Sequence, residues 1–287
     1  MRIIVTGSTG FVGRHLLAAL PEGATVHTVS RGSGPGNHHG LDLRDEAAVR
    51  SLLTAVRPDV VVHLAAIAQV RDHSASAVRA VNVDAAAQLA ASLWAVRPGA
   101  RLLAVSTGYV HGETTTAAAE DAPLNPVGLY ATSKAEMETA VRAVSRGRDL
   151  CIVRPFNHTG PGQSASHAVP AFIEKARAVA SGAADHLAVG DLSAVRDLAD
   201  VRDLAQGLVR LVGMSELPSM LQVCSGQGRT MATVLQQILD LVGVPDAPVR
   251  SVGRSVLRQN IGDPKCARSL GIGARPLAST LGDMLRL

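Results

Sequence analysis

Apolar runs of strand type alternate with Ala- and Leu-rich segments of helical length through the first half of the chain. The strand-like runs are 3–6 (IIVT), 25–29 (TVHTV), 59–66 (DVVVHLAA), 101–106 (RLLAVS) and 150–155 (LCIVRP). Segments of helical length cover 15–20, 46–56, about 74–96 and about 129–145. Strands without polar alternation, separated by helices, are typical of a parallel sheet covered on both faces. The pattern therefore predicts an α/β fold with a doubly wound parallel sheet of the Rossmann type.

After Pro155 this alternation breaks into a stretch rich in Gly, Pro and His, NHTGPGQSASHAVP, and shorter helices follow with turns such as GVPDAP. A length of 287 residues suits one nucleotide-type domain with a modest appendage. We expect a dinucleotide-binding domain at 1–155 and a mainly substrate-binding α/β region at 156–287. In this division, some segments of 156–287 can still pack within the dinucleotide-binding domain.

Composition excludes several classes of protein. Hydrophobic residues make up 47% of the chain, but no apolar run approaches the ~20 residues of a membrane span. The first residues, MRIIVTG, do not resemble a signal peptide, so we expect a soluble, cytoplasmic protein. The three cysteines, Cys151, Cys224 and Cys266, lie far apart. Their spacing favours buried thiols over a disulfide framework or a zinc site, and we expect no metal.

The net charge of +4 raises the question of nucleic acid binding. Arg and Lys are scattered along the chain, and aromatic residues amount to only 2%, which leaves little for base stacking. The charge is better explained by a small anionic ligand, and we expect neither nucleic acid nor membrane as a partner.

A glycine-rich turn, GSTGFVG, comes after the first strand and leads into the first helix, with glycines at 7, 10 and 13. Such glycines let the backbone approach a pyrophosphate at a helix N-terminus, where free N–H groups and the helix dipole favour negative charge. The spacing GxxGxxG is weak by itself, but its position between strand and helix makes it specific.

The end of the second strand indicates which dinucleotide binds. Folds that bind NAD usually carry an acidic residue there, about 20 residues after the glycines, whereas this chain has Ser30 and Arg31. A hydroxyl and a guanidinium would hold a 2′-phosphate that a carboxylate would repel. The sequence therefore favours NADP(H), the alternative being that Arg31 is a solvated surface residue. Asp42 is a candidate acceptor for the adenine amino group, and 65–68 (AAIA) would line the path to the nicotinamide.

A second motif, YATSK, places Tyr130 and Lys134 four residues apart on a predicted helix, so both project from one face. An ammonium beneath a phenol, together with a cationic nicotinamide, would favour the phenolate and make the phenol a usable acid and base near neutral pH. Ser106 and Thr107 end the strand before this helix, in STGYVHG.

These motifs, with DLRD, HLAA and RPFNHTGPGQ, resemble the extended short-chain dehydrogenase/reductases, also called the NAD-dependent epimerase/dehydratase family, over essentially the whole chain. The resemblance implies that Tyr130 is the acid/base and that Lys134 orients the cofactor ribose and lowers the phenol pKa. It also implies that Thr107, five residues before Gly112, hydrogen-bonds the reacting sugar oxygen. It implies a homodimer formed partly by the Tyr130 helix. The residues expected to contact the cofactor are Gly7, Thr9, Gly10, Phe11, Val12, Gly13, Ser30, Arg31, Asp42, Leu43, Leu64, Ala65, Ala66, Lys134 and Pro155.

Within the family, RPFNHTGPGQ and VGDLSAVRDLADVRDLA (189–205) are most similar to GDP-4-keto-6-deoxy-mannose reductases and their dehydratase relatives. This similarity implies a nucleotide-linked sugar as substrate. The residues expected to contact that substrate are Thr107, Tyr109, Asn157, Arg196 and Arg254, with Asn157 at the diphosphate. For each arginine the alternative is a surface or interface salt bridge. The nucleotide stays open among GDP, TDP, UDP and CDP, because Arg254 is followed by Ser255 where many reductases have proline.

The two residues after Thr107 bear on the choice of reaction. Dehydratases in the family carry an acidic pair or a Ser/Glu variant there, whereas this chain has Gly108 and Tyr109. We find no second acid/base set for C3/C5 epimerisation. Ser30 and Arg31 favour consumption of external NADPH over a tightly held NAD. We therefore expect NADPH-dependent reduction of the 4-keto group of a nucleotide-linked 4-keto-6-deoxyhexose, with a nucleotide-sugar 4-epimerase as the alternative. A cofactor sensor without activity is the non-enzyme alternative, which the intact YATSK disfavours.

Overall fold

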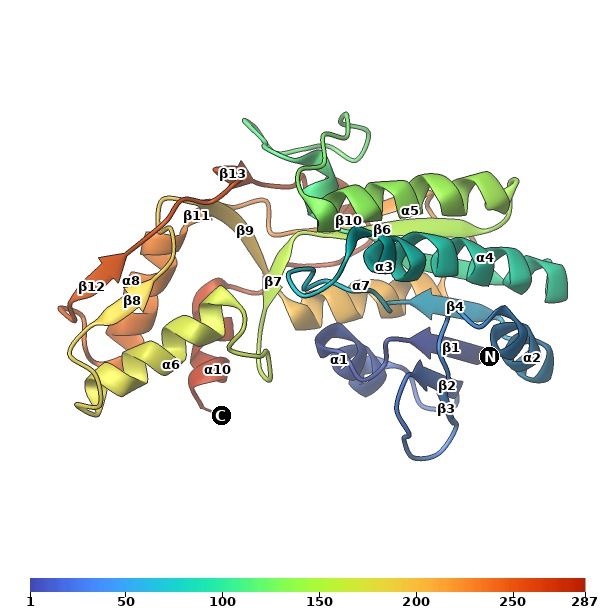
Figure 1. Cartoon of the computed structure of the whole chain (residues 1–287), viewed down its shortest axis with the longest axis horizontal. Helices are drawn as coiled ribbons and strands as arrows, with labels where there is room; N and C mark the ends of the chain where they lie inside the picture. The colour runs from blue at the N-terminus through green and yellow to red at the C-terminus, as the bar shows by residue number, and fades with distance from the viewer. Residues whose placement is uncertain (287) are drawn as a thin grey trace.

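The structure is a computed structural model that describes residues 1–286, and its centre is a sheet of seven strands (Figure 1). The strand order is β10-β6-β5-β4-β1-β2-β3, and every pairing is parallel. The strands are β1 (Arg2–Thr6), β2 (Thr25–Ser30), β3 (His38–Gly40), β4 (Val60–His63), β5 (Arg101–Val105), β6 (Leu150–Pro155) and β10 (Met220–Val223). This confirms the doubly wound parallel sheet expected from the sequence.

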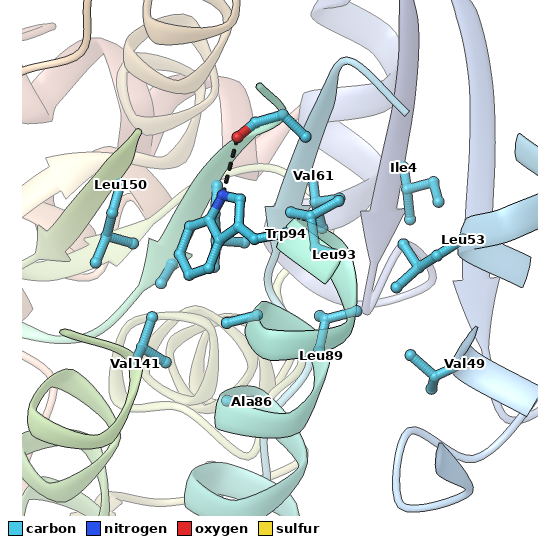
Figure 2. Close-up of a cluster of buried hydrophobic side chains, with 14 of the residues drawn as sticks. Ile4, Val49, Leu53, Val61, Ala86, Leu89, Leu93, Trp94, Val141 and Leu150 are labelled. Carbon is cyan, nitrogen blue, oxygen red and sulfur yellow. Dashed lines mark hydrogen bonds between the residues drawn. The ribbon is translucent and has the colours of Figure 1, made fainter. Parts of the chain in front are cut away.

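Helices cover both faces of the sheet. One face carries α2 (Glu46–Val56), α3 (Ala75–Arg79), α4 (Ala85–Val96) and α5 (Leu129–Ser145). The other carries α1 (Phe11–Ala19), α7 (Val201–Gly213) and α9 (Lys265–Ser269). In the core of the first face, Leu53 of α2 and Leu93 of α4 lie against the strand residues Ile4 and Val61 (Figure 2). The Trp94 indole N–H donates to the Ala100 carbonyl at 3.0 Å, so the polar end of this buried ring is satisfied.

The Ala-rich helix expected at about 74–96 is present, but it is not a regular α-helix throughout. Ser74 caps its start by accepting from the Ala77 N–H at 3.2 Å. Between α3 and α4 the chain forms one π-helical turn, η1 (Ala80–Asp84). Such turns insert an extra residue into a helix and occur frequently at functional sites.

The remaining elements form a smaller part with its own apolar core, which lies to the left in Figure 1. Its helices are α6 (Ala168–Ala180), α8 (Met231–Val242) and α10 (Leu277–Leu285). Its strands are β7 (Asn157–Thr159), β8 (Leu187–Val189), β9 (Val195–Asp200), β11 (Gly228–Thr230), β12 (Val249–Ser251) and β13 (Gln259–Asn260). Of the segments after residue 156, β10 joins the large sheet and α7 packs beside α1.

The strand order reverses between β1 and β4, which are neighbours in the sheet. In open α/β sheets ligands bind at the carboxyl ends of the strands where the order reverses. The glycine-rich turn comes after β1, and the segment 64–68 comes after β4. The fold therefore brings these two segments together at the position where a dinucleotide is expected.

Candidate active site

The turn between β1 and α1 places glycines where no side chain fits. Gly7 has φ +69°, and a Cβ there would lie 2.7 Å from the Ala65 nitrogen. A Cβ on Gly13 would lie 2.5 Å from the Gly7 carbonyl oxygen. The next helix, α1, begins at Phe11, and its N-cap residue Gly10 has no side chain to cap the helix. Bare backbone thus lies beside a helix N-terminus whose first N–H groups favour an anion.

An inner cavity of about 460 Å³ opens beside this turn, at the carboxyl ends of β1, β4, β5 and β6. It gathers most of the residues expected at the site. Those that line it are Gly7, Gly10, Phe11, Val12, Gly13, Leu64, Ala66, Thr107, Tyr109, Tyr130, Lys134, Pro155 and Asn157. Its size is that of a small-molecule site.

Thr107, Tyr130 and Lys134 lie together on one side of this cavity. Thr107 lies just beyond β5 and caps a 3₁₀ helix, η2 (Gly108–His111), by accepting from the Tyr109 N–H at 3.3 Å. Tyr130 and Lys134 occupy successive turns of α5 and face the cavity side by side. The structure therefore brings together the three residues expected to do the chemistry.

The electrostatics of this trio differ from the sequence-based expectation. Burial raises the pKa of Tyr130 to about 12, a nearby Tyr109 adds to the rise, and a hydrogen bond with the Thr107 hydroxyl opposes it. Burial also lowers the pKa of Lys134 to about 8, although the negative charge of Glu138 acts to raise it. In the protein alone desolvation outweighs the expected lowering of the phenol pKa. At neutral pH Tyr130 is therefore a protonated phenol, the form that donates a proton.

Two buried polar residues behind the trio were not identified from the sequence. His63 lies at the end of β4 with its Nδ1 2.8 Å from the Thr6 hydroxyl. Burial, and secondarily the charge of Lys134, lowers its pKa to about 3, so the imidazole is neutral.

Asn82, on the π-helical turn, is the second of them. Its Oδ1 accepts from the Ile67 N–H at 2.7 Å, and its Nδ2 donates to the Ile67 carbonyl and to Ser133 Oγ, each at 3.0 Å. Since Ser133 precedes Lys134, Asn82 ties the segment after β4 to α5, the helix that carries Tyr130 and Lys134. A lone amide on the buried face of an Ala-rich helix was the signal that could have identified it.

An outer cavity of about 440 Å³ adjoins the inner one in the smaller part of the molecule. Tyr109, Asn157, His158, Gln163 and His167 line both cavities, so the two form one cleft. Asn157 Nδ2 donates to the Tyr109 hydroxyl at 2.7 Å, which places both side chains at the junction. A ligand long enough to fill the cleft would pass these residues.

The two candidate arginines lie in different surroundings. Arg196 lines the outer cavity, but its Nη1 and Nη2 already donate to the carbonyls of Val195 and Leu257, at 2.8 and 2.9 Å. Fewer of its five N–H groups are therefore free for a ligand. Arg254 is exposed in the loop after β12 and does not line either cavity.

At the far end of the sheet, Ser30 and Arg31 lie at the end of β2 and precede a loop that folds onto His38. The ring of His38 contacts Ser30 Oγ at 3.2 Å and the Gly32 carbonyl at 2.8 Å. Asp42 is bound by Arg44, whose guanidinium and backbone N–H hold the pKa of that carboxyl at about 2. The Asp42 oxygens thus already accept hydrogen bonds from Arg44, which leaves them fewer lone pairs for an adenine amino group. Of the remaining expected contacts, Thr9 is exposed and Leu43 packs against the core.

The sequence profile described as NAD dependent epimerase/dehydratase family matches residues 3–223. The chain belongs to this family. Membership confirms the resemblance drawn from the motifs.

This family member is similar to several characterised proteins. It is 30% identical over 251 residues to the GDP-6-deoxy-D-mannose reductase of Pseudomonas aeruginosa, covering 85% of this chain and 81% of that one. The solved structure of RMD from Pseudomonas aeruginosa complexed with NADPH superposes with a TM-score of 0.85 at 27% identity, covering 99% and 97% of the two chains. The UDP-glucose 4-epimerase of Thermus thermophilus in complex with NAD gives 0.84 at 25% identity, covering 99% of each chain.

The residues of this epimerase/dehydratase family member fit a nicotinamide dinucleotide. Gly7 and Gly13 leave open the space that side chains would fill, and Lys134 and Tyr130 line the same cavity. Within residues 1–286, no cluster of three or more His, Cys, Asp or Glu side chains has the arrangement of a metal site. No helix in this range is both long and apolar enough to cross a bilayer.

Proposed function

We propose that the protein reduces the 4-keto group of a nucleotide-linked 4-keto-6-deoxyhexose with NADPH. The observation that carries this proposal is the composition of the inner cavity. Thr107, Tyr130 and Lys134 line it, whereas none of its lining residues within 1–286 is Asp, Glu or Cys. The cavity can thus donate one proton beside a hydride donor, but it lacks a carboxyl group for moving water between C5 and C6.

Packing explains why the position after Thr107 is not acidic. A Cβ on Gly108 would lie 2.6 Å from the ring of Phe156, which is buried. Any side chain at residue 108 would displace that ring. The packing of η2 against the end of β6 therefore leaves no room for an acidic side chain at residue 108. This supports reduction over dehydration.

In this proposal each residue has a defined part. The reduced nicotinamide, when bound, supplies a hydride to the sugar C4. Tyr130 gives its phenolic proton to the O4 atom as the carbonyl becomes an alcohol, and the Thr107 hydroxyl donates to O4 and polarises the C=O bond. Lys134 holds the cofactor ribose and, when charged, stabilises the phenolate left on Tyr130. Asn157 and Arg196 bind the nucleotide diphosphate farther along the cleft.

NADPH is favoured over NADH by the residues at the end of β2. Arg31 is exposed, with Ser30 beside it, and no acidic residue stands at either position. The related Pseudomonas structure is a complex with NADPH. We expect Arg31→Asp to weaken NADPH binding relative to NADH, because a carboxylate would repel the 2′-phosphate. An unchanged preference would remove this part of the proposal.

The alternative is a 4-epimerase that keeps NAD bound through each turnover. The likeness to the Thermus UDP-glucose 4-epimerase favours it, since the same trio can oxidise and re-reduce C4. The two functions differ in stoichiometry, because only the reductase consumes one external cofactor for each product.

The deciding experiment mixes purified protein with NADPH or NADH and with GDP- or dTDP-linked 4-keto-6-deoxyhexoses, and follows the nicotinamide absorbance. We expect stoichiometric oxidation of NADPH by one of the sugars and none with the Tyr130→Phe variant. Conversion of UDP-sugars by protein that copurifies with NAD, without oxidation of added NADPH, would show the epimerase instead. Activity retained by Tyr130→Phe would disprove the acid/base assignment.

A further inference from the structure

His38 lies on β3, the edge strand of the large sheet, and its ring contacts three groups around the end of β2. Its Nδ1 is 2.8 Å from the Thr28 hydroxyl. Its Nε2 is 3.2 Å from the Ser30 hydroxyl and 2.8 Å from the Gly32 carbonyl oxygen. These contacts flank Arg31, on which the proposed preference for NADPH depends.

The loop after β2 packs closely on the His38 ring. A Cβ at Gly34 would lie 2.6 Å from the ring Cγ, so only glycine lets the loop approach this closely. Three of the six residues 31–36 (RGSGPG) are glycine. Glycine loses more conformational freedom on ordering than any other residue, so such a loop has little order of its own. The contacts with His38 therefore hold in one shape a loop that its own sequence leaves free.

The partners of the His38 ring also determine where its hydrogen lies. A carbonyl oxygen can only accept, so the Nε2 that contacts the Gly32 carbonyl carries a hydrogen. The Ser30 hydroxyl, 3.2 Å from the same nitrogen, therefore faces a donor and does not spend its own hydrogen on the ring. That hydrogen can be donated to a ligand, and phosphate oxygens are strong acceptors.

The end of β2 adjoins the glycine-rich turn at which the pyrophosphate is expected. The Gly7 N–H donates to the Val29 carbonyl at 2.9 Å, and Ser30 and Arg31 follow Val29 directly. Arg31 is exposed, and it belongs to the loop that His38 holds. A dinucleotide that extends from the turn along the end of β2 therefore brings its ribose toward both residues.

We propose that His38 is a positioning residue for NADPH, which holds the loop 31–36 so that Ser30 and Arg31 bind the 2′-phosphate together. The inference rests on the proposed function, in which NADPH is the reductant. A loop that already has its binding shape loses less freedom when the cofactor arrives, and binding is tighter by that difference. NADH has a hydroxyl in place of the 2′-phosphate, so it gains little from the same support.

The test measures the dissociation constants of NADPH and NADH for the full chain by fluorescence titration. His38→Phe keeps a ring but removes both ring nitrogens. We expect it to weaken NADPH binding about 5- to 20-fold and NADH binding less than about 2-fold, because only NADPH carries the group that the loop holds. An equal loss for both cofactors would show a general structural role and overturns the inference, as does no loss for either.

His39→Phe is the matched control. His39 is the next residue of β3, so its side chain points to the opposite face of the sheet, where its Nε2 is 3.0 Å from His27 Nδ1. It should leave the ratio of the two dissociation constants unchanged. Gly34→Ala is a second variant, which keeps the histidine but pushes the loop off its ring. It should cause the same selective loss of NADPH binding, and an unchanged ratio in this variant contradicts the proposal.

A double replacement separates positioning of Arg31 from other effects of His38. In an Arg31→Ala protein the loop no longer carries the guanidinium, so adding His38→Phe should weaken NADPH binding less than about 2-fold further. An effect of His38→Phe that is equally large with and without Arg31 overturns the inference. If the unaltered protein binds NADH as tightly as NADPH, the proposed cofactor itself fails.

Discussion

Lys134 carries a charge that the fold disfavours. Only 2% of the residue is exposed, and burial lowers the pKa of its ammonium group from an ordinary 10.5 to about 8. Between these two pH values the unfolded chain holds a proton that the folded chain does not. Stability therefore rises as the pH increases from about 8 to 10.5, and the full cost of the buried charge is present below pH 8.

Replacing this lysine should stabilise the protein while destroying its activity. Each pKa unit corresponds to about 1.4 kcal/mol, so we expect Lys134→Met to raise the free energy of unfolding at pH 7 by about 1–3 kcal/mol. The gain should vanish near pH 10.5, the ordinary lysine value. Urea titrations at pH 7, 9 and 10.5 measure it, with the exposed Lys265→Met as control. Equal stability of Lys134→Met and the unaltered protein at pH 7 would contradict the account.

His63 should make the protein sensitive to acid. Burial lowers its pKa from 6.5 to about 3, so in this range the unfolded chain binds a proton that the folded chain refuses. Stability is lost as the pH falls below about 6.5, by about 2 kcal/mol at pH 5 from this residue alone. We expect His63→Gln to flatten the dependence of unfolding free energy on pH between 7 and 5. A parallel curve for the variant would mean that other groups carry the effect.

At the scale of elements, one buried ion pair joins α5, the helix of Tyr130 and Lys134, to the sheet. Arg154 of β6 and Glu138 of α5 form two hydrogen bonds, at 2.9 and 2.6 Å, and both side chains are 4% exposed. Arg154 also donates to the Glu120 carbonyl at 2.9 Å. Because Glu138 lies one turn beyond Lys134, the pair fixes the part of α5 that faces the cavity.

Breaking the pair from one side should cost more than removing both charges. Glu138→Leu leaves the Arg154 guanidinium buried without its carboxylate, and we expect a loss of about 3–5 kcal/mol in unfolding free energy. The double replacement Glu138→Leu, Arg154→Met should recover most of that loss, because no uncompensated charge remains. Chemical denaturation of the two variants tests this. A double variant no more stable than Glu138→Leu alone would show that the pair stabilises through contacts other than charge.

Elements could be predicted from the sequence where the signal is local. The helices at 46–56 and 129–145 match α2 and α5, because apolar periodicity and flanking turns determine them. The π-helical turn around Asn82 has no such signature. Asn260, a buried residue of β13 that lines the inner cavity, could not be identified either. β13 has two residues, and the Gly108 and Gly112 carbonyls to which the Asn260 amide donates lie about 150 positions earlier in the chain. Sites built from distant turns depend on tertiary contacts that periodicity does not encode.

At the scale of the whole molecule, the smaller part reaches across the cleft to the glycine-rich turn. His15 of α1 is 2.9 Å from the Pro161 carbonyl, and Arg14 donates to the Gly162 carbonyl at 3.2 Å. The ring of Phe11 stacks on His158, with centroids 6.0 Å apart. The loop after β7 thus contacts the start of α1, where the pyrophosphate is expected. Bound cofactor and bound sugar would therefore share one wall of the cleft. Each should affect how fast the other binds and dissociates.

The homodimer implied by the family resemblance would be formed partly by α5, the helix of Tyr130, and we expect its neighbour α4 to join it in the contact with a second copy. These two helices lie side by side (Figure 1). Their exposed residues include small ones, Ala91 and Ala95 on α4 and Thr132 and Thr139 on α5, with the longer Arg142 near the end of α5. Small side chains allow helices to approach closely, and a long charged one prevents it. We expect Ala91→Arg to convert the dimer to a monomer in sedimentation velocity.

Ala232→Arg is the matched control, because Ala232 is exposed on α8, far along the chain from this face. It should leave the sedimenting mass unchanged. Since α5 also carries Tyr130 and Lys134, the monomer should lose turnover more than cofactor binding, as the helix loses its outer support. A dimer that persists in Ala91→Arg would place the contact on another face, and a monomeric unaltered protein would remove the expectation altogether.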